Sequence, residues 1–371
     1  MFEKKKYYSL YKIQETGATY KMIIGERSNG KTYAVLRYGL LRYAKDGTQM
    51  AIVRRWSEDF TGKRGSVMFD SLVLNGEVEK ITHGKWTGVY YYASKWFLCR
   101  MDDKDKRITD DRPFAYGFSI SAMEHDKSTS YPAVRVVMFD EFICRAAYLP
   151  DEFVLFCNTL STIIRDRMDV EIYMLGNTVN RYCPYFAEMG LDHVKEQKQG
   201  TIDVYRYGDS DLTVAVEYCA PQKSGKKSDR YFAFANPKLS MITGGTWEVN
   251  LYPHLPRKYV PADVLFRYYV EWDKELLQAE IVCQGWGIDD NTAVFTYIHR
   301  WTSDVPEDQL LFSRVRMPSP YRRQRINLPI DDIGKRIWQF FRESQVYYQD
   351  NTVGEVVRNY LLWCGAESDD A

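Results

Sequence analysis

Short apolar runs separated by polar segments dominate the first 220 residues of the chain. Four of these runs are rich in apolar and β-branched side chains and predict buried strands: residues 21–24, 50–54, 134–139 and 170–175. Residues 33–41 continue apolar behind the first run and predict a helix, as do residues 151–168, where Pro150 and Asp151 give the start signal. The pattern predicts an α/β fold around a central, mostly parallel sheet.

A second pattern is aromatic. Two segments between residues 86 and 122 are rich in Tyr, Phe, Trp and Val, and the highly charged stretch 102–107 separates them. We interpret them as a β-hairpin with an exposed charged tip. Lys104, Lys106 and Arg107 at this tip are candidate contacts to a DNA phosphate backbone, and a solvated tip is the alternative.

The character of the chain changes after residue 221. Residues 203–217 predict two more strands, and residues 222–249 predict a linker that starts polar and basic and includes a short helical segment. Three strands and then two helices are expected beyond it: residues 264–272, 277–282, 293–301, 331–348 and 353–363. We therefore predict a first domain at 1–221 and a smaller α/β or α+β domain at 250–371.

Composition narrows the class of protein. The 371 residues include 50 Lys plus Arg and 50 Asp plus Glu, so the net charge is zero and only local patches could hold a polyanion. The seven cysteines are scattered and never spaced C-x-x-C, which indicates a reducing compartment and argues against a zinc site. No apolar run approaches 18 residues and no signal peptide is evident, so we expect a cytosolic protein without a membrane span.

The segment between the first predicted strand and helix carries the clearest chemistry. Its sequence, GERSNGKT, fits the phosphate-binding pattern G-x-x-x-x-G-K-[ST] in the strand, loop and helix order that the pattern requires. Lys31 is expected to reach the β- and γ-phosphates of a nucleotide and Thr32 to bind Mg²⁺. The predicted nucleotide-binding residues are Gly25, Arg27, Ser28, Asn29, Gly30, Lys31 and Thr32. A glycine turn with an exposed lysine is the alternative.

Two further strand ends supply polar groups. The strand at 134–139 ends in Asp140 and Glu141, and carboxyl ends of parallel strands meet beside a phosphate-binding loop. Asp140 is therefore a candidate ligand of nucleotide-bound Mg²⁺, and Glu141 a candidate to polarise the attacking water. Asn177, after the strand at 170–175, is a candidate sensor of the γ-phosphate, and an amide in a turn is the alternative.

Two pairs of arginines allow alternative interpretations. Arg54 and Arg55 end a predicted strand and could pair with phosphates or a neighbouring subunit, and a solvated pair is equally consistent. Arg165 and Arg167 end a predicted helix, where positive charge suits the helix dipole. The alternative for this second pair is an arginine that reaches the γ-phosphate of a neighbouring subunit.

With these motifs, the chain resembles the genome-packaging ATPases of small protein-primed podophages, relatives of the terminase large subunits in the additional-strand, catalytic-glutamate class of P-loop NTPases. The resemblance rests on Gly25–Thr32, residues 136–142 and residues 175–177, and on domain order and size in the C-terminal half. It implies a P-loop ATPase motor domain and a vestigial ribonuclease H-like second domain.

The resemblance also assigns roles to single residues. It matches Lys31, Thr32, Asp140, Glu141 and Asn177 to the nucleotide site. It places Arg165 or Arg167 at the trans-acting arginine and Arg145 at the DNA channel.

The implied function is ATP- and Mg²⁺-dependent translocation of double-stranded DNA into a procapsid. The implied partners are DNA, the portal and four further copies in a pentameric ring, with an RNA partner left open. The implied location is the host cytoplasm, with transient attachment to the procapsid. Rival interpretations are a small-molecule or nucleotide kinase and a nucleotide-gated switch.

A terminase with an active nuclease is a further alternative. Acidic residues of the second domain are available for it: Asp263, Glu271, Asp273, Asp289, Asp290, Asp331 and Asp332. Glu271 and Asp273 are expected on one strand face, but no third partner is evident. The basic stretch at 322–325 could bind nucleic acid, and a solvated loop is the alternative.

Overall fold

The computed structural model describes residues 8–125, 130–144, 148–220, 247, 252–254, 259–284 and 293–366. The chain divides into two compact units, of which the first comprises residues 1–144 and 151–247 and the second residues 145–150 and 248–371. The predicted domain limits of 1–221 and 250–371 stay predictions, because the expected linker lies, apart from Trp247, outside the described residues.

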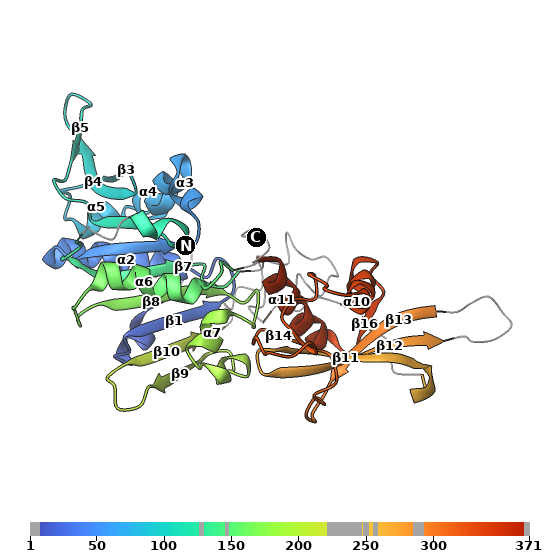
Figure 1. The fold of residues 1–371 in the computed structure, drawn as a ribbon. Coiled ribbons are helices and arrows are strands. Elements are labelled where there is room, and N and C mark those ends of the chain that lie inside the picture. Colours follow the sequence, from blue (N-terminus) through green and yellow to red (C-terminus); the bar gives the residue numbers. More distant parts are fainter. Residues whose placement is uncertain are drawn as a thin grey trace, which may run out of the picture. The chain divides into compact units, whose positions relative to one another are not determined.

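The first unit is built on one large sheet (Figure 1). Its strands follow the order β3-β4-β6-β2-β7-β8-β1-β10-β9, and β5 pairs with β4. The strand bounds are β1 Tyr20–Gly25, β2 Gln49–Arg54, β3 Gly88–Tyr92, β4 Lys95–Met101, β5 Arg107–Thr109, β6 Ala115–Ser119, β7 Val134–Asp140, β8 Glu171–Asn177, β9 Thr201–Arg206 and β10 Thr213–Tyr218. In the run β6-β2-β7-β8-β1-β10 every neighbouring pair of strands is parallel. This confirms the predicted α/β fold with a mostly parallel sheet.

Strand β8 lies between β1 and β7, so the strand that leads to the phosphate loop and the strand that ends in Asp140 are not neighbours. This is the additional strand expected from the resemblance. The antiparallel strands β3, β4 and β5 extend the sheet beyond β6. The charged tip predicted near residue 104 joins β4 to β5.

The helices of the first unit are α1 Tyr11–Glu15, α2 Lys31–Asp46, α3 Gly62–Ser66, α4 Asp70–Leu74, α5 Glu77–Ile81, α6 Glu152–Ile164 and α7 Pro184–Glu188. Strand β7 shows which faces the two long helices cover, because its side chains alternate between them. Val136 and Met138 belong to the core cluster that contains α2 residues, whereas Phe139 stacks on Phe156 of α6. Helices α2 and α6 therefore cover opposite faces, as right-handed crossovers in opposite directions require.

The second unit contains a smaller, mixed sheet of order β15-β14-β11-β12-β13-β16. The bounds of its elements are β11 Val264–Trp272, β12 Glu275–Gln284, β13 Ala293–Arg300, β14 Leu311–Ser313, β15 Arg322–Arg323, β16 Val346–Tyr348, α10 Asp332–Arg342 and α11 Asn351–Ala366. Strands β11, β12 and β13 are antiparallel, and β14, β15 and β16 join in parallel. This sheet agrees with an α/β or α+β domain, and the ribonuclease H-like assignment stays a prediction.

The predicted hairpin between residues 86 and 122 is wrong, because its first segment alone forms the antiparallel pair β3–β4, and β6 pairs mainly with β2. Two predicted helices also differ from the structure. The helix expected at 331–348 ends at Arg342, and residues 346–348 instead form β16 beside β13, after a left-handed turn at Ser344. The helix expected to reach Met168 ends at Ile164, because Arg165 has φ +51°. Among the described residues, no helix is long and apolar enough to cross a membrane.

Candidate nucleotide site

The phosphate-binding loop joins β1 to α2 at the carboxyl edge of the first sheet. Two of its residues take left-handed backbone conformations, Ser28 with φ +61° and Gly30 with φ +92°. Gly25 lets Cys219, the residue that follows β10, pack closely against the start of the loop, since a Cβ at position 25 would lie 2.8 Å from Cβ of Cys219. The loop therefore turns tightly against the sheet and begins α2 at Lys31, as its sequence predicts.

Lys31 is buried at the centre of the loop. Its Nζ donates to the carbonyl of Glu26 at 2.7 Å, and to the carbonyl of Gly25 and Oδ1 of Asn177, both at 3.3 Å. Burial lowers the pKa of Lys31 to about 8, against the opposing effect of nearby acidic groups such as Asp140. A glycine turn with an exposed lysine is therefore wrong, since Lys31 is 6% exposed.

Thr32 and Asp140 meet across the site. The Thr32 hydroxyl donates to Oδ1 of Asp140 at 3.2 Å, and burial raises the pKa of this carboxyl although Arg54 lies beside it. Two oxygen ligands on adjacent corners of an octahedral Mg²⁺ shell lie about 3 Å apart, so this pair has the chemistry and the spacing for that ion. The described residues contain no group of three or more His, Cys, Asp or Glu that could hold a metal.

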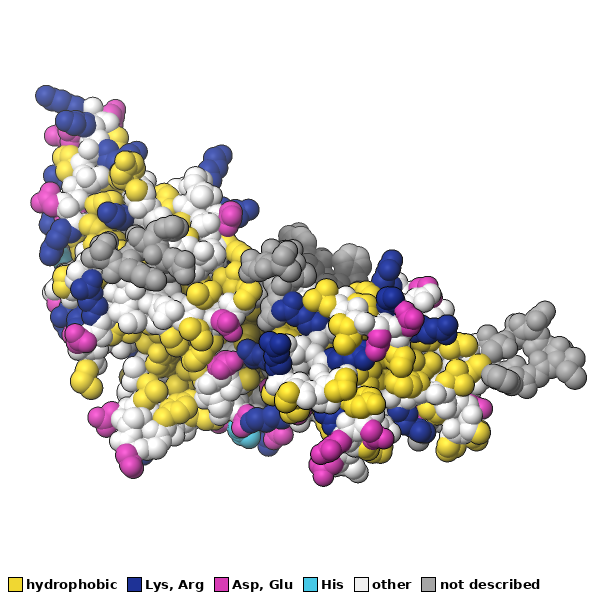
Figure 2. Space-filling view, viewed as in Figure 1, with side chains coloured by type: hydrophobic (Ala, Val, Ile, Leu, Met, Phe, Trp, Pro, Cys, Tyr) yellow, Lys and Arg dark blue, Asp and Glu magenta, His cyan; other side chains and the backbone are white. Residues whose placement is uncertain are grey.

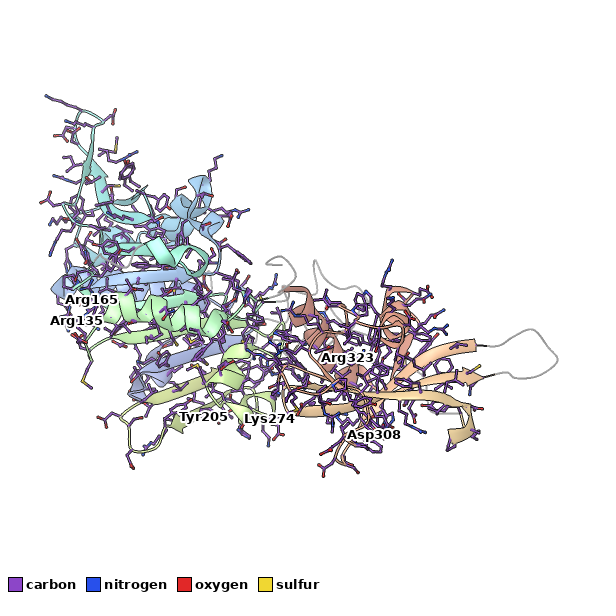
Figure 3. The ribbon with its side chains drawn as sticks, in the orientation of Figure 1. Arg135, Arg165, Tyr205, Lys274, Asp308 and Arg323 are labelled. Carbon is purple, nitrogen blue, oxygen red and sulfur yellow. The ribbon has the colours of Figure 1, made fainter. Side chains whose placement is uncertain are left out.

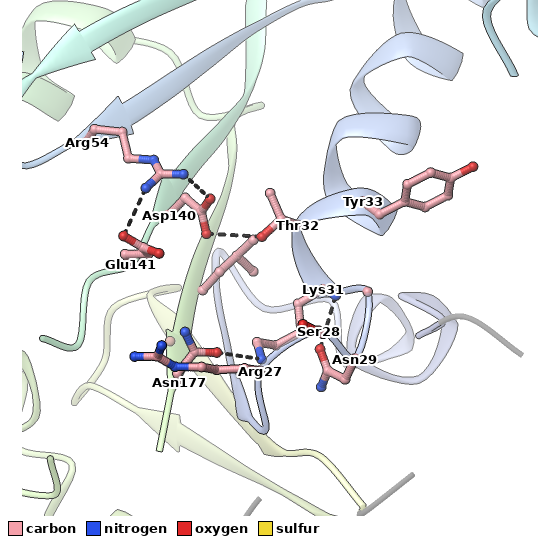
Figure 4. Close-up of a pocket in the computed structure, with 13 residues that line it drawn as sticks. Arg27, Ser28, Asn29, Lys31, Thr32, Tyr33, Arg54, Asp140, Glu141 and Asn177 are labelled. Atoms are coloured by element: carbon pink, nitrogen blue, oxygen red, sulfur yellow. Dashed lines mark hydrogen bonds and ion pairs between the residues drawn. The ribbon is translucent and has the colours of Figure 1, made fainter. Parts of the chain in front are cut away.

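Arg54 bridges the two carboxylates at the end of β7 (Figure 4). Its Nη2 lies 2.7 Å from Asp140 and its Nη1 lies 3.0 Å from Glu141. Glu141 has a left-handed backbone, with φ +62°, and its side chain is 63% exposed. The alternative of a solvated pair is wrong, because Arg54 at the end of β2 contacts two carboxylates and Arg55, the next residue, is buried against Glu152.

These groups line one pocket of about 440 Å³. Its lining residues are Arg27, Ser28, Asn29, Gly30, Lys31, Thr32, Tyr33, Arg54, Asp140, Glu141, Leu175, Gly176 and Asn177. Four parallel strands contribute to it, and Asn177 at the end of β8 reaches Lys31 (Figure 4). The pocket brings together every predicted nucleotide-binding residue except Gly25, whose carbonyl nevertheless contacts Lys31.

The predicted trans-acting arginines lie elsewhere. Helix α6 runs from the carboxyl edge of the sheet back to the opposite edge, and Figure 3 labels Arg165 at that far end. Arg165 is exposed and has φ +51° and ψ −130°. The Arg167 guanidinium instead donates to the carbonyls of Ile163, Ile164, Pro132 and Val134.

The described candidate DNA contacts are not among the residues that line the pocket. Lys104, Lys106 and Arg107 lie at the β4–β5 turn, where the Asp102 carboxylate accepts the backbone N–H groups of Lys104 and Lys106. All three basic residues are exposed, and Lys and Arg side chains gather at this tip in Figure 2. Arg107 also stacks on the ring of Tyr90 at 4.5 Å. Arg145 lies outside the described residues.

The acidic candidates that the structure describes in the second unit do not form a cluster that could hold a metal. Glu271 accepts a hydrogen bond from Ser313 at 2.8 Å, and Asp273 lies in the turn after β11, so the expected shared strand face is wrong. Asp263 accepts the backbone N–H of Val260, and Asp331 pairs with Arg323. Asp332 pairs with Lys335. Asp289 and Asp290 lie outside the described residues.

The basic stretch at 322–325 is also engaged within its unit. Arg322 donates to the carbonyls of Val305, Pro306 and Gln309, and Arg325 lies over the ring of Trp363. A nucleic-acid contact through this stretch would compete with these bonds.

Comparison with known proteins agrees with the sequence resemblance. Residues 99–207 match the family described as podovirus DNA encapsidation protein (Gp16). The DNA packaging protein of Bacillus phage B103 is 28% identical over 175 residues, which is 46% of this chain and 47% of that protein. The DNA packaging protein of Bacillus phage phi29 is 26% identical over 192 residues, 51% of this chain and 52% of that protein. The match thus spans about half the length of these relatives.

Two solved structures share the fold over nearly the whole chain. The Phi-28 gp11 DNA packaging motor has a TM-score of 0.53 at 19% identity and covers 97% of this chain and 98% of its own. The bacteriophage Phi-29 viral genome packaging motor assembly has a TM-score of 0.55 at 17% identity, with 95% of this chain and 96% of its own covered. The predicted resemblance to podophage packaging ATPases is therefore confirmed.

Proposed function

We propose that this protein is an ATPase that drives double-stranded viral DNA into a procapsid. The observation that carries the proposal is the convergence of Lys31, Thr32, Asp140 and Glu141 on one pocket at the carboxyl edge of a parallel sheet. A lysine and a loop of backbone N–H groups suit a triphosphate, and a threonine hydroxyl beside a buried aspartate suits its Mg²⁺. The similarity to DNA packaging proteins supports DNA as the cargo.

The chain's own groups divide the reaction between them. Lys31 binds the β- and γ-phosphates, and when bound, Mg²⁺ neutralises charge that develops on the phosphates, with Thr32 and Asp140 as its protein ligands. Glu141 orients the attacking water and accepts its proton. Asn177, which contacts Lys31 at 3.3 Å, senses whether the γ-phosphate is present.

Arg54 sets a condition on this chemistry. Its guanidinium lies 3.0 Å from Glu141, so the ion pair occupies a carboxylate oxygen that the attacking water needs. Glu141 must therefore turn away from Arg54, or share it with another anion, before it orients that water. A γ-phosphate in the pocket is an anion of this kind.

Arg165 completes the site of a neighbouring subunit. It lies at the sheet edge opposite its own pocket, it is exposed, and its backbone is in a region that non-glycine residues rarely adopt. Arg167 is less suited, because its guanidinium contacts four backbone carbonyls of its own unit. A site shared in this way requires a ring. We propose a pentamer at the portal of the procapsid in the host cytoplasm, and leave an RNA partner open.

DNA passes the exposed basic groups of this ring. Lys104, Lys106 and Arg107 form a local patch on a neutral chain, and Arg145 is a further candidate. A phosphate backbone needs such patches and no particular base sequence. We assign the second unit a role without DNA cleavage.

A kinase and a nucleotide-gated switch remain rivals, and one experiment separates all three. The steady-state ATPase rate of the full chain is measured with and without duplex DNA. A motor hydrolyses ATP faster with DNA, a switch turns over slowly whether or not DNA is present, and a kinase requires another acceptor. A rate that duplex DNA leaves unchanged contradicts the motor.

Two variants test the site itself. Glu141→Gln keeps the shape of the side chain without its charge, so we expect ATP binding to persist and hydrolysis to fall by about 10²- to 10⁴-fold. Lys31→Ala should weaken ATP binding itself. Near-normal turnover in Glu141→Gln removes Glu141 from catalysis, and unchanged affinity in Lys31→Ala removes Lys31 from the phosphate site.

A further inference from the structure

The backbone that presents Glu141 is held in an unusual conformation. With φ +62° this residue is left-handed, a region that a side chain with a Cβ rarely occupies unless its surroundings hold it there. The Glu141 side chain is 63% exposed, so packing of that side chain does not supply the hold. The conformation must therefore be fixed through the backbone or through the next residues.

Phe142 supplies part of the hold. It is fully buried, and its N–H donates to the carbonyl of Leu175 at 3.2 Å. Its ring lies close to Gly176, where an added Cβ would be 2.9 Å from Cε1 of Phe142. These contacts anchor the residue after Glu141 to β8, but leave the carbonyl groups of Glu141 and Phe142 to another partner.

Arg55 is that partner. Its Nη1 donates to the carbonyl of Glu141 at 3.3 Å and its Nη2 donates to the carbonyl of Phe142 at 3.0 Å. The side chain is 7% exposed, and its bond to the Phe142 carbonyl is buried, where leaving a carbonyl unpaired is costly. Its bond to the Glu141 carbonyl is partly buried. A planar guanidinium can hold two successive carbonyls while its other N–H groups pair with Glu152, and the compact ammonium of a lysine does not reproduce this fixed geometry.

Glu152 and Tyr185 orient the guanidinium. Oε2 of Glu152 accepts from Nε of Arg55 at 2.6 Å and Oε1 accepts from Nη2 at 2.8 Å. The Tyr185 hydroxyl donates to the same Oε1 at 2.8 Å, and burial raises its pKa well above the usual value. Glu152 begins α6 and Tyr185 lies in α7, so the carboxylate and the hydroxyl fix Arg55 from two helices.

We propose that Arg55 is a positioning residue for ATP hydrolysis, which fixes the left-handed turn at Glu141 and so aims the catalytic carboxylate at the pocket. The inference rests on the proposed function. Without Arg55, the backbone of Glu141 relaxes toward an ordinary conformation and the Cα–Cβ bond changes direction. Lys31, Thr32 and Asp140 do not contact Arg55 in any described bond, so ATP binding stays and the chemical step slows.

The test separates positioning from stability. In Arg55→Met/Glu152→Leu both buried charges leave together, so no unpaired charge stays in the core. The remaining cost is that the two carbonyls and the Tyr185 hydroxyl lose these partners. Arg55→Lys keeps the charge opposite Glu152 but loses the planar fork that contacts Glu152 and the two carbonyls together. Arg135→Met is the matched control, because it removes an arginine from the far end of the same unit, where Arg135 pairs with Asp169.

Both Arg55 variants should lower kcat by about 10- to 100-fold and leave KM for ATP within about twofold, since small misplacements of a catalytic group cost this much. Thermal melting of the full chain verifies folding, and kcat is measured with duplex DNA present. Combined with Glu141→Gln, either change should cause little further loss, because the group that Arg55 aims is already disabled. Arg135→Met should hydrolyse ATP like the wild type.

Three results overturn the inference. Wild-type kcat in a folded Arg55 variant shows that Glu141 does not depend on Arg55. A full additional loss in the Glu141→Gln background shows that Arg55 acts through another group. A wild-type protein without ATPase activity overturns the proposed function, and this inference with it.

Discussion

The two sheets of this chain use the polar residues at their strand ends in opposite ways. In the first sheet, side chains from the carboxyl ends of β1, β2, β7 and β8 face one open pocket of about 440 Å³. In the second sheet, the described acidic groups pair within the unit, as Glu271 does with Ser313 and Asp331 with Arg323. Glu280, which is 1% exposed, lies between Tyr259 and Arg267.

Strand direction explains the difference. Neighbouring parallel strands end at the same edge of the sheet, so the strand direction alone brings together polar residues that are far apart in sequence. The three central strands of the second sheet are antiparallel, and their carboxyl ends alternate between two edges. A site therefore forms readily in the first sheet, while the second sheet needs a special arrangement that its described residues do not make.

The largest expected effect concerns Arg165, which lies at the edge of the first sheet opposite the pocket of its own chain. Arg165→Ala should lower the ATPase rate of the assembled ring by about 10³- to 10⁵-fold, because a trans-acting arginine stabilises charge on the transferring phosphate. Nucleotide affinity should change little. The rate per subunit is measured against protein concentration and on portals, and the steep rise of the wild type should flatten in the variant.

Arg167→Ala is the matched change. We expect it to lower thermal stability, because partly buried carbonyls such as those of Ile163 and Val134 lose this donor, while a folded fraction keeps its rate. Mixing Arg165→Ala with Glu141→Gln should restore some activity, since one subunit supplies the arginine and its neighbour a sound glutamate. A monomer that hydrolyses ATP at the full rate contradicts the trans mechanism.

The sequence predicted the pocket well because its parts are local motifs on strand ends. Residues 25–32 and the pair Asp140 and Glu141 could be located from pattern alone, and the parallel sheet brings them together. The sequence does not indicate the partners of Arg54 and Arg55, because two adjacent arginines at a strand end carry no sign of which carboxylate each will meet. Only the fold places Glu152, 97 positions later, against Arg55.

The second sheet was harder to predict for a related reason. Strands β14 and β15 are three and two residues long, too short for a hydrophobic period to appear. Residues 346–348 continue the apolar pattern of α10 in sequence, and only the pairing with β13 makes them a strand. In such short elements tertiary contacts decide the structure.

A smaller effect, which sharpens the same comparison, follows from the burial of Lys31 in the first sheet. Its pKa is lowered to about 8, and a bound polyphosphate favours the charged form. Below pH 8 the lysine is charged in both states, so ATP affinity should not change through this group. Above pH 8 binding must take up a proton, and affinity should fall by up to about tenfold per pH unit.

Calorimetric titration of the full chain with ATP between pH 7 and 10 measures this effect. Lys31→Arg, which stays charged throughout, should bind more weakly at pH 7 but show no such slope. A wild-type ATP affinity that stays constant up to pH 10 contradicts the prediction that Lys31 must take up a proton when ATP binds.

The smallest expected effect belongs to the second sheet. The full chain should not cleave duplex DNA with Mg²⁺ or Mn²⁺, and Glu271→Ala should leave the DNA-stimulated ATPase rate within about twofold, because Glu271 contacts Ser313 and no acidic partner in the described bonds. Agarose gels of plasmid and linear DNA measure cleavage. Cutting that Glu271→Ala abolishes would break the comparison and favour a terminase with an active nuclease.

The contact between Gly25 and Cys219 bears on how such a chain can change over generations. A Cβ at position 25 would lie 2.8 Å from Cβ of Cys219. Two constraints therefore favour glycine here: the close packing against Cys219 and the turn of the phosphate-binding loop. Cys219 is buried, and burial raises its pKa to about 12, which keeps the thiol protonated and inert toward oxidants at neutral pH. Among descendants of this sequence, positions 25 and 219 should vary together or not at all, and a bulkier residue at 219 should be as rare as a lost glycine in the loop.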